Sequence, residues 1–84
     1  MSGVSGMRTL EVFSRPGCHL CEQLLEELLP LVRGKLKPVV HNVDDDAAWQ
    51  EAYGLKIPVV VFEGRSLCEF KLDRDAVLRI VDRL

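Results

Sequence analysis

A strand, a helix and a second strand follow one another directly near the start of this chain, and that order constrains the fold most strongly. Residues 9–14 (TLEVFS) carry β-branched and aromatic side chains and meet a breaker, Pro16-Gly17. Residues 18–32 then repeat apolar side chains at three- and four-residue spacing, as an amphipathic helix does. A further β-branched run occupies residues 38–43 (PVVHNV). Two strands joined through a helix run parallel with a right-handed crossover, so the sequence predicts an α/β layer structure.

The first helix should bury one stripe and stop early. Pro30 cannot donate a backbone hydrogen bond to Glu26, so we expect the helix to end or kink just before it, and Gly34 supplies a stop. The predicted buried stripe consists of Cys21, Leu24, Leu25, Leu28, Leu29 and Val32.

The rest of the chain predicts two more helices and a hairpin. The aspartates at 44–46 are placed to cap a helix over residues 47–53. Residues 59–62 form an apolar strand, and residues 66–71 return as its hairpin partner after a turn. Asp73 can cap a last helix, giving the order β-α-β-α-β-β-α. The predicted buried stripe of that last helix is Ala76, Val77, Ile80, Val81 and Leu84.

Length and composition bound the class of protein. With 84 residues, 48% of them hydrophobic and 29% charged, the chain has room for one domain, which we place at residues 8–84. Residues 1–7 are small and polar and predict a flexible tail without a secretory signal, so we expect a cytoplasmic monomer. The net charge of −2 without a basic stripe argues against a nucleic-acid partner. No apolar run approaches the ~20 residues that span a membrane.

Two cysteines, Cys18 and Cys21, stand three residues apart where the first strand gives way to the helix. Their sulfur atoms then lie nearly one turn apart and can close a disulfide ring. Cys18 falls at the helix amino end, where free N–H groups and the macrodipole favour an anion, so we expect its thiol pKa to lie below the ordinary ~8.5. Arg15 and His19 can add positive charge. Cys21, on the apolar stripe, is the expected resolving thiol.

Other uses of the cysteines are less favoured by the sequence. A structural zinc site wants four ligands, and His19, His41 and Cys68 do not stand at a familiar ligand spacing, so we assign no metal ligand. Cys68 alternates with Phe70 and Leu72 on one side of the fourth strand, which predicts a buried core thiol. An iron–sulfur site shared between two chains remains an alternative.

Three stretches give the chain a family resemblance from Thr9 onward. They are residues 14–21 (SRPGCHLC), residues 43–46 (VDDD) and residues 53–61 (YGLKIPVVV). In these motifs the sequence resembles the glutaredoxins, and more closely a group of short bacterial glutaredoxin-like proteins. The resemblance implies a thioredoxin fold with a four-stranded mixed sheet in the order 2-1-3-4. It further implies a cis Pro58 facing the cysteines, which turns the backbone of Ile57 toward Cys18 to pair with an extended substrate.

The sequence also departs from that family. His19-Leu20 stands where glutaredoxins usually have Pro-Tyr, so the aromatic wall for glutathione is missing. Residues 70–75 (FKLDRD) lack the usual Gly-Gly pair before the last helix. Arg15 does match a basic residue common three positions before the first cysteine, where it can pair with a glutathione carboxylate.

These features predict a thiol–disulfide oxidoreductase in which Cys18 attacks a disulfide and Cys21 resolves the mixed disulfide. The expected partner is a disulfide-bearing protein or a low-molecular-weight thiol, with no bound cofactor and with glutathione as one candidate reductant. The alternative is a redox-inactive thioredoxin-fold binding module that holds a partner at Ile57-Pro58.

Overall fold

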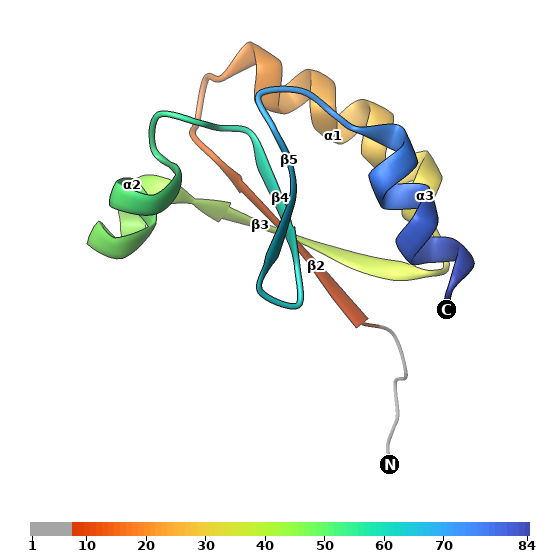
Figure 1. Cartoon of the computed structure of the whole chain (residues 1–84). Helices are drawn as coiled ribbons and strands as arrows, with labels where there is room; N and C mark the ends of the chain where they lie inside the picture. The colour runs from red at the N-terminus through yellow and green to blue at the C-terminus, as the bar shows by residue number, and fades with distance from the viewer. Residues whose placement is uncertain (1–7) are drawn as a thin grey trace.

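The computed structural model describes residues 8–84 and shows one sheet with helices on both of its faces (Figure 1). The tail predicted at residues 1–7 lies outside the described residues. In chain order the elements are β2 (Arg8–Ser14), α1 (His19–Val32), β3 (Leu36–Asn42), the short 3-10 turn η1 (Val43–Asp45), α2 (Ala47–Tyr53), β4 (Val59–Phe62), β5 (Arg65–Glu69) and α3 (Arg74–Asp82).

The sheet has four strands in the order β3-β2-β4-β5. β2 pairs in parallel with β3, from Arg8 opposite Leu36 to Ser14 opposite Asn42. β4 runs antiparallel to both β2 and β5. This mixed sheet confirms the α/β class and the predicted strand order 2-1-3-4.

Alternation along the strands divides the core between the two faces of the sheet. Leu10 and Val12 of β2 point into an aliphatic cluster with Leu24 and Leu28 of α1. Phe13 points the other way, into a cluster with Val43 of η1, Val59 and Val61. In Figure 1, α1 and α3 cover the first face and α2 lies beyond the second. The hydrophobic effect therefore fixes which helix lies on which side.

The first helix departs from its prediction at Pro30. We expected the helix to end or kink before this residue; α1 does not end there but continues through Pro30 to Val32, so the expected early end was wrong. Pro30 and Glu26 are both exposed, so water can satisfy the carbonyl of Glu26 that lacks its helical donor. The helix ends two residues later, which confines the lost bond to the final turn.

The buried stripe of α1 is also narrower than predicted. Cys21, Leu24, Leu28 and Val32 are all at most 2% exposed, whereas Leu29 is 42% exposed. The buried residues are separated by three, four and four positions, so they form a single line against the sheet. Leu29 lies at the edge of that line and was wrongly placed in the core. Leu84 follows α3 and is likewise exposed.

The fourth strand ends earlier than predicted. We expected residues 66–71 to be extended, but β5 stops at Glu69 and Phe70 adopts a positive φ of 68°. This turn reverses the expected alternation, so Cys68 is buried while Phe70 is 51% exposed. The prediction that Phe70 faces the core was therefore wrong, and the one for Cys68 is confirmed.

Aspartates cap both later helices, as the sequence predicts. The Asp46 carboxylate accepts hydrogen bonds from the backbone N–H groups of Ala48 and Trp49 at 2.8 and 3.2 Å. Asp73 accepts one from Ala76 at 3.1 Å. Both carboxylates satisfy backbone donors that a helix leaves free in its first turn.

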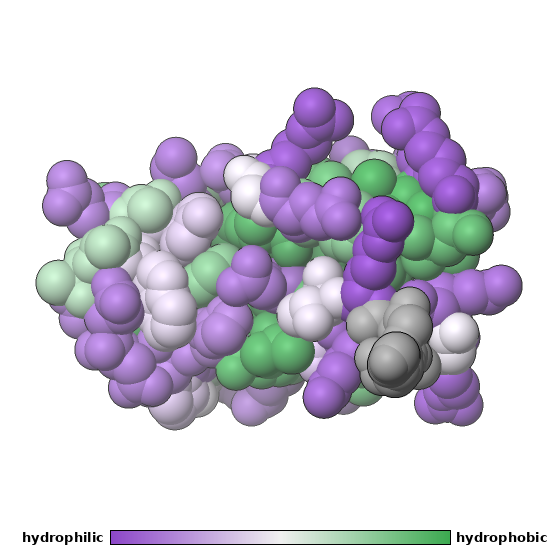
Figure 2. All heavy atoms as spheres, turned by 90° about the horizontal axis from the view of Figure 1, so that it is seen from below, coloured by the Kyte–Doolittle hydropathy of each residue, from purple (hydrophilic) through white to green (hydrophobic). Residues whose placement is uncertain are grey.

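The surface of the molecule mixes hydrophilic and apolar side chains. Seen from below, hydrophilic side chains surround apolar patches that remain visible between them (Figure 2). Within residues 8–84, no helix has the length and apolar character needed to cross a membrane.

Candidate functional site

The turn between β2 and α1 places Cys18 at the amino end of the helix. Gly17 adopts a φ of 78°, a conformation that favours glycine, and the backbone N–H of Cys18 then bonds to the carbonyl of Arg15 at 3.2 Å. Cys18 is the N-cap residue of α1, and its sulfur accepts the backbone N–H of Cys21 at 3.2 Å. A sulfur atom here lies at the positive end of the helix.

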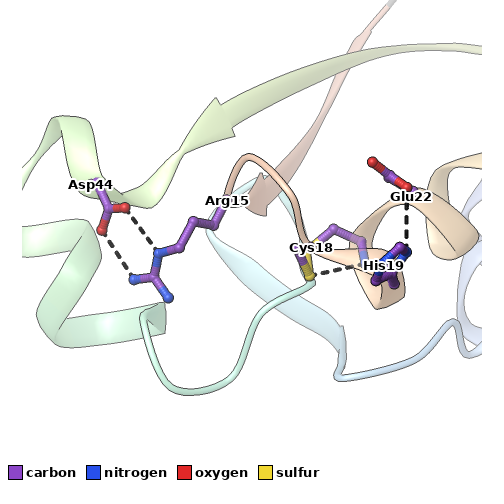
Figure 3. The surroundings of a disulfide bond; sticks show 6 residues. Arg15, Cys18, His19, Glu22 and Asp44 are labelled. Carbon is purple, nitrogen blue, oxygen red and sulfur yellow. Dashed lines mark hydrogen bonds and ion pairs between the residues drawn. A yellow bond between two sulfur atoms is a disulfide. The ribbon is translucent and has the colours of Figure 1, made fainter.

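Cys18 and Cys21 form a disulfide, with their Cα atoms 5.2 Å apart (Figure 3). The two sulfur atoms have different surroundings. Cys18 is half-buried on the turn, whereas Cys21 is 2% exposed and packs below it on the buried stripe of α1. The outer sulfur is therefore the one that an incoming molecule can reach.

The segment before β4 lies beside this turn. The sheet pairs Phe13 with Val59, so Pro58, one residue earlier, lies next to the end of β2 from which the turn departs. Pro58 is buried and the Ile57–Pro58 peptide bond is cis. Within residues 8–84, neither the amide nor the carbonyl of Ile57 has a backbone hydrogen-bond partner. The fold thus brings Ile57 and Pro58, at the start of β4, close to the end of β2 after which Cys18 follows.

Arg15 makes a two-pronged contact that the sequence did not indicate. Its Nε and one terminal nitrogen donate to the two carboxylate oxygens of Asp44 at 2.9 and 3.0 Å (Figure 3). Hydrogen bonding to Arg15 lowers the pKa of Asp44, and the same bond raises the pKa of Arg15. Each side chain remains about two-fifths exposed, at 41% and 43%. Asp44 comes from the aspartate run assigned only to helix capping, and its separation of 29 residues from Arg15 left no local signal.

His19 faces solvent. Its side chain is 98% exposed, and its Nδ1 lies 3.9 Å from the Glu22 carboxylate, one turn along α1 (Figure 3). The placement favours a solvated histidine over a strong positive neighbour for Cys18, because a screened charge acts weakly.

Cys68 is separate from the cysteine pair. It is the free cysteine of the described chain, and it is buried in the aliphatic cluster. Burial raises the pKa of its thiol, which keeps it protonated and unreactive at neutral pH. Within residues 8–84, no three His, Cys, Asp or Glu side chains are grouped so as to hold a metal ion.

The fold and this site define a thioredoxin-fold domain with a cysteine pair of the redox type. Residues 9–81 match the family model described as "Glutaredoxin-like domain (DUF836)". The chain therefore belongs to this glutaredoxin-like family, as the resemblance in its motifs implies. No protein among the curated ones matches it.

Solved structures of the same kind share the fold. The solution structure of protein Ne2328 from Nitrosomonas europaea is 31% identical, with a TM-score of 0.78, and the match covers 95% of this chain and 98% of that one. The X-ray structure of XcR50 from X. campestris is 32% identical, with a TM-score of 0.67 and coverage of 90% and 99%. Its solution structure is 35% identical, with a TM-score of 0.65 and coverage of 90% and 95%.

Proposed function

We propose that this protein is a dithiol thiol–disulfide oxidoreductase that uses Cys18 and Cys21. The observation that carries the proposal is the cysteine pair at the amino end of α1, with its outer sulfur half-buried and its inner sulfur covered. An accessible attacking thiol and a covered resolving thiol suit disulfide exchange through a mixed intermediate.

The reaction begins with the protein in its dithiol form. The Cys18 thiolate attacks a substrate disulfide, the substrate S–S bond breaks, and one substrate thiolate leaves and takes a proton. Cys21 then loses its proton and attacks the Cys18 sulfur, which releases the second substrate thiol and closes the Cys18–Cys21 disulfide. Two electrons pass to the substrate. Two low-molecular-weight thiols, such as glutathione, restore the dithiol and become a disulfide themselves.

The amino end of the helix favours the thiolate form of Cys18, which is the form that attacks. In the disulfide form the Cys18 sulfur already accepts the N–H of Cys21, and a thiolate accepts such a bond more strongly because it is charged. We therefore expect the pKa of Cys18 in the dithiol protein to lie below the ~8.5 of a free cysteine.

Ile57 and Pro58 form the proposed substrate platform. The free main-chain groups of Ile57 suit an extended peptide that pairs with the segment before β4, beside Cys18. Arg15 is a weaker candidate for holding a substrate carboxylate, since Asp44 already occupies two of its donors. A carboxylate ligand would have to use the remaining nitrogen of Arg15 or displace Asp44.

Three single substitutions test the proposal in a glutathione-coupled disulfide reduction assay. Cys18→Ser removes the attacking sulfur and abolishes turnover, while Cys21→Ser lets the mixed disulfide accumulate, which mass spectrometry detects as an added glutathione. Cys68→Ser changes a buried cysteine outside the pair and should keep turnover. Turnover that survives in Cys18→Ser would overturn the proposal. Partner binding without turnover in the native protein would instead support the binding module.

A further inference from the structure

A small hollow opens between α1 and the loop that joins β5 to α3. Its volume is about 260 Å³, below the ~300–1,000 Å³ that is usual for sites of drug-sized molecules. Leu20 and Leu24 line it from α1, and Phe70 and Leu72 line it from the loop. The size and lining suit a single apolar side chain better than a complete small-molecule ligand.

Phe70 is held at this hollow against its ordinary preferences. A bulky residue at a φ of 68° is strained, and such strain persists where surrounding contacts impose it. Here the Phe70 N–H donates to the carbonyls of Pro58 and Lys56 at 2.9 and 3.1 Å. The contact ties Phe70 to the segment that carries Ile57 and Pro58, while its ring stays 51% exposed.

Leu20 brings the hollow next to the cysteine pair. It lies between Cys18 and Cys21 in the chain and is 53% exposed on the first turn of α1. Leu20 and Phe70 thus leave two large apolar side chains in water on one concave patch. Burying them against a partner removes apolar surface from water, which stabilises the complex.

The charges of the hollow favour a neutral occupant. Glu27 and Lys71 are the ionised side chains that line it, and their opposite signs leave no net charge to attract an anion such as glutathione. Leu20, which lines the hollow, also stands between Cys18 and Cys21 in the chain. A chain joined to the Cys18 sulfur by its own cysteine therefore carries its neighbouring residues over this patch.

We propose that the hollow selects protein disulfides whose cysteine has a large apolar residue close beside it in sequence, with Phe70 as the residue that determines this specificity. The inference rests on the proposed oxidoreductase function and adds the substrate class to it. The occupant is the apolar side chain of that neighbouring residue, seated between Leu20 and Phe70.

Steady-state kinetics with two synthetic peptide disulfides test the selection. The peptides are identical except that leucine or alanine stands next to the cysteine. The native protein should favour the leucine peptide about tenfold in kcat/KM, the lower end of what one apolar pocket discriminates. Phe70→Ala should abolish the preference, and Phe70→Leu should retain most of it.

Val40→Ala is the matched control. Val40 is also 51% exposed but lies on β3, at the opposite edge of the sheet from β5. Its substitution should leave the peptide preference intact. Equal kcat/KM values for the two peptides in the native protein, or a preference that survives in Phe70→Ala, would overturn the proposal.

A binding measurement separates failure of this inference from failure of the proposed function. The leucine peptide with serine in place of its cysteine is titrated into the disulfide-form protein and followed by NMR. Shifts centred on Leu20 and Phe70, without turnover of either peptide, would support the hollow and reject the enzyme. Turnover of both peptides at equal rates, without such shifts, would reject the hollow and support the enzyme.

Discussion

The two faces of the sheet are built differently. The face under α1 and α3 is mostly aliphatic and closed, and Leu10, Leu28 and Val77 are fully buried there. The face toward α2 is aromatic and thinner. Phe13 stacks on Tyr53 with ring centroids 4.3 Å apart and meets Trp49 edge-on at 5.4 Å, and α2 has no buried residue.

The two faces contribute differently to the surroundings of the cysteine pair. The closed face holds the inner sulfur, Cys21, within the stripe of α1. The aromatic face supports the segments that flank the outer sulfur, because Ile57 packs on its cluster and Asp44 reaches Arg15 from the turn before α2. The cysteine pair thus lies between the closed face and a face whose helix has no buried residue, and the less buried face should tolerate substitution better.

The largest expected loss of stability comes from a substitution in the core of the closed face. Leu28→Ala leaves a cavity among fully buried neighbours, so unfolding free energy should fall by about 2–5 kcal/mol, measured by urea denaturation. Leu29→Ala on the same helix is the control, since Leu29 is 42% exposed and its loss should cost less than about 1 kcal/mol. Equal losses for the two variants would contradict the description of α1 as a helix with one buried stripe.

A smaller loss is expected on the aromatic face. Tyr53→Ala removes the ring stacked on Phe13 and should reduce unfolding free energy by about 1–2 kcal/mol in the same measurement. Tyr53→Phe keeps the ring and should stay close to the native value. If Tyr53→Ala costs as much as Leu28→Ala, the two faces contribute equally and the contrast between them is wrong.

The Arg15–Asp44 pair predicts that the stability of the folded protein depends on pH. Because the folded protein lowers the pKa of Asp44, its carboxylate adds stability above the unfolded value of ~3.9, and this stability is lost as the pH falls through the folded value. Asp44→Asn should therefore lower the Tm slightly at neutral pH and not at strongly acid pH. Asp45→Asn is the control, because within residues 8–84 Asp45 makes no ion pair. A Tm loss that persists at strongly acid pH would contradict this account.

The smallest expected effect is on the pKa of Cys18 and comes from the solvent-exposed His19. His19→Ala should raise the pKa of Cys18 in the dithiol protein only slightly, because the histidine is 98% exposed and its charge is screened. Glu22→Gln should shift that pKa downward, since it removes a negative charge from the first turn of α1. Thiolate absorbance measured against pH reports both, and a large shift in His19→Ala would show direct contact with the sulfur.

Local patterns predicted most of the framework. The alternation in residues 9–14, the helical stripe after Cys18 and the capping aspartates at 46 and 73 each involve neighbours within a few positions, so the sequence displays them directly. The errors arose where tertiary packing acts. α1 continues through Pro30, where the carbonyl that lacks a donor belongs to the exposed Glu26, and Phe70 adopts a positive φ while its amide bonds to the carbonyls of Lys56 and Pro58.

By itself, the sequence determined the order of strands and helices and placed Cys18 at the start of a helix, because these features depend on local periodicity and on the spacing of two residues. Only the tertiary structure decided that Asp44 binds Arg15 and that Leu20 and Phe70 share one hollow. These contacts join segments far apart in the chain. They form only once the sheet has brought its strand ends together, so no local sequence pattern indicates them.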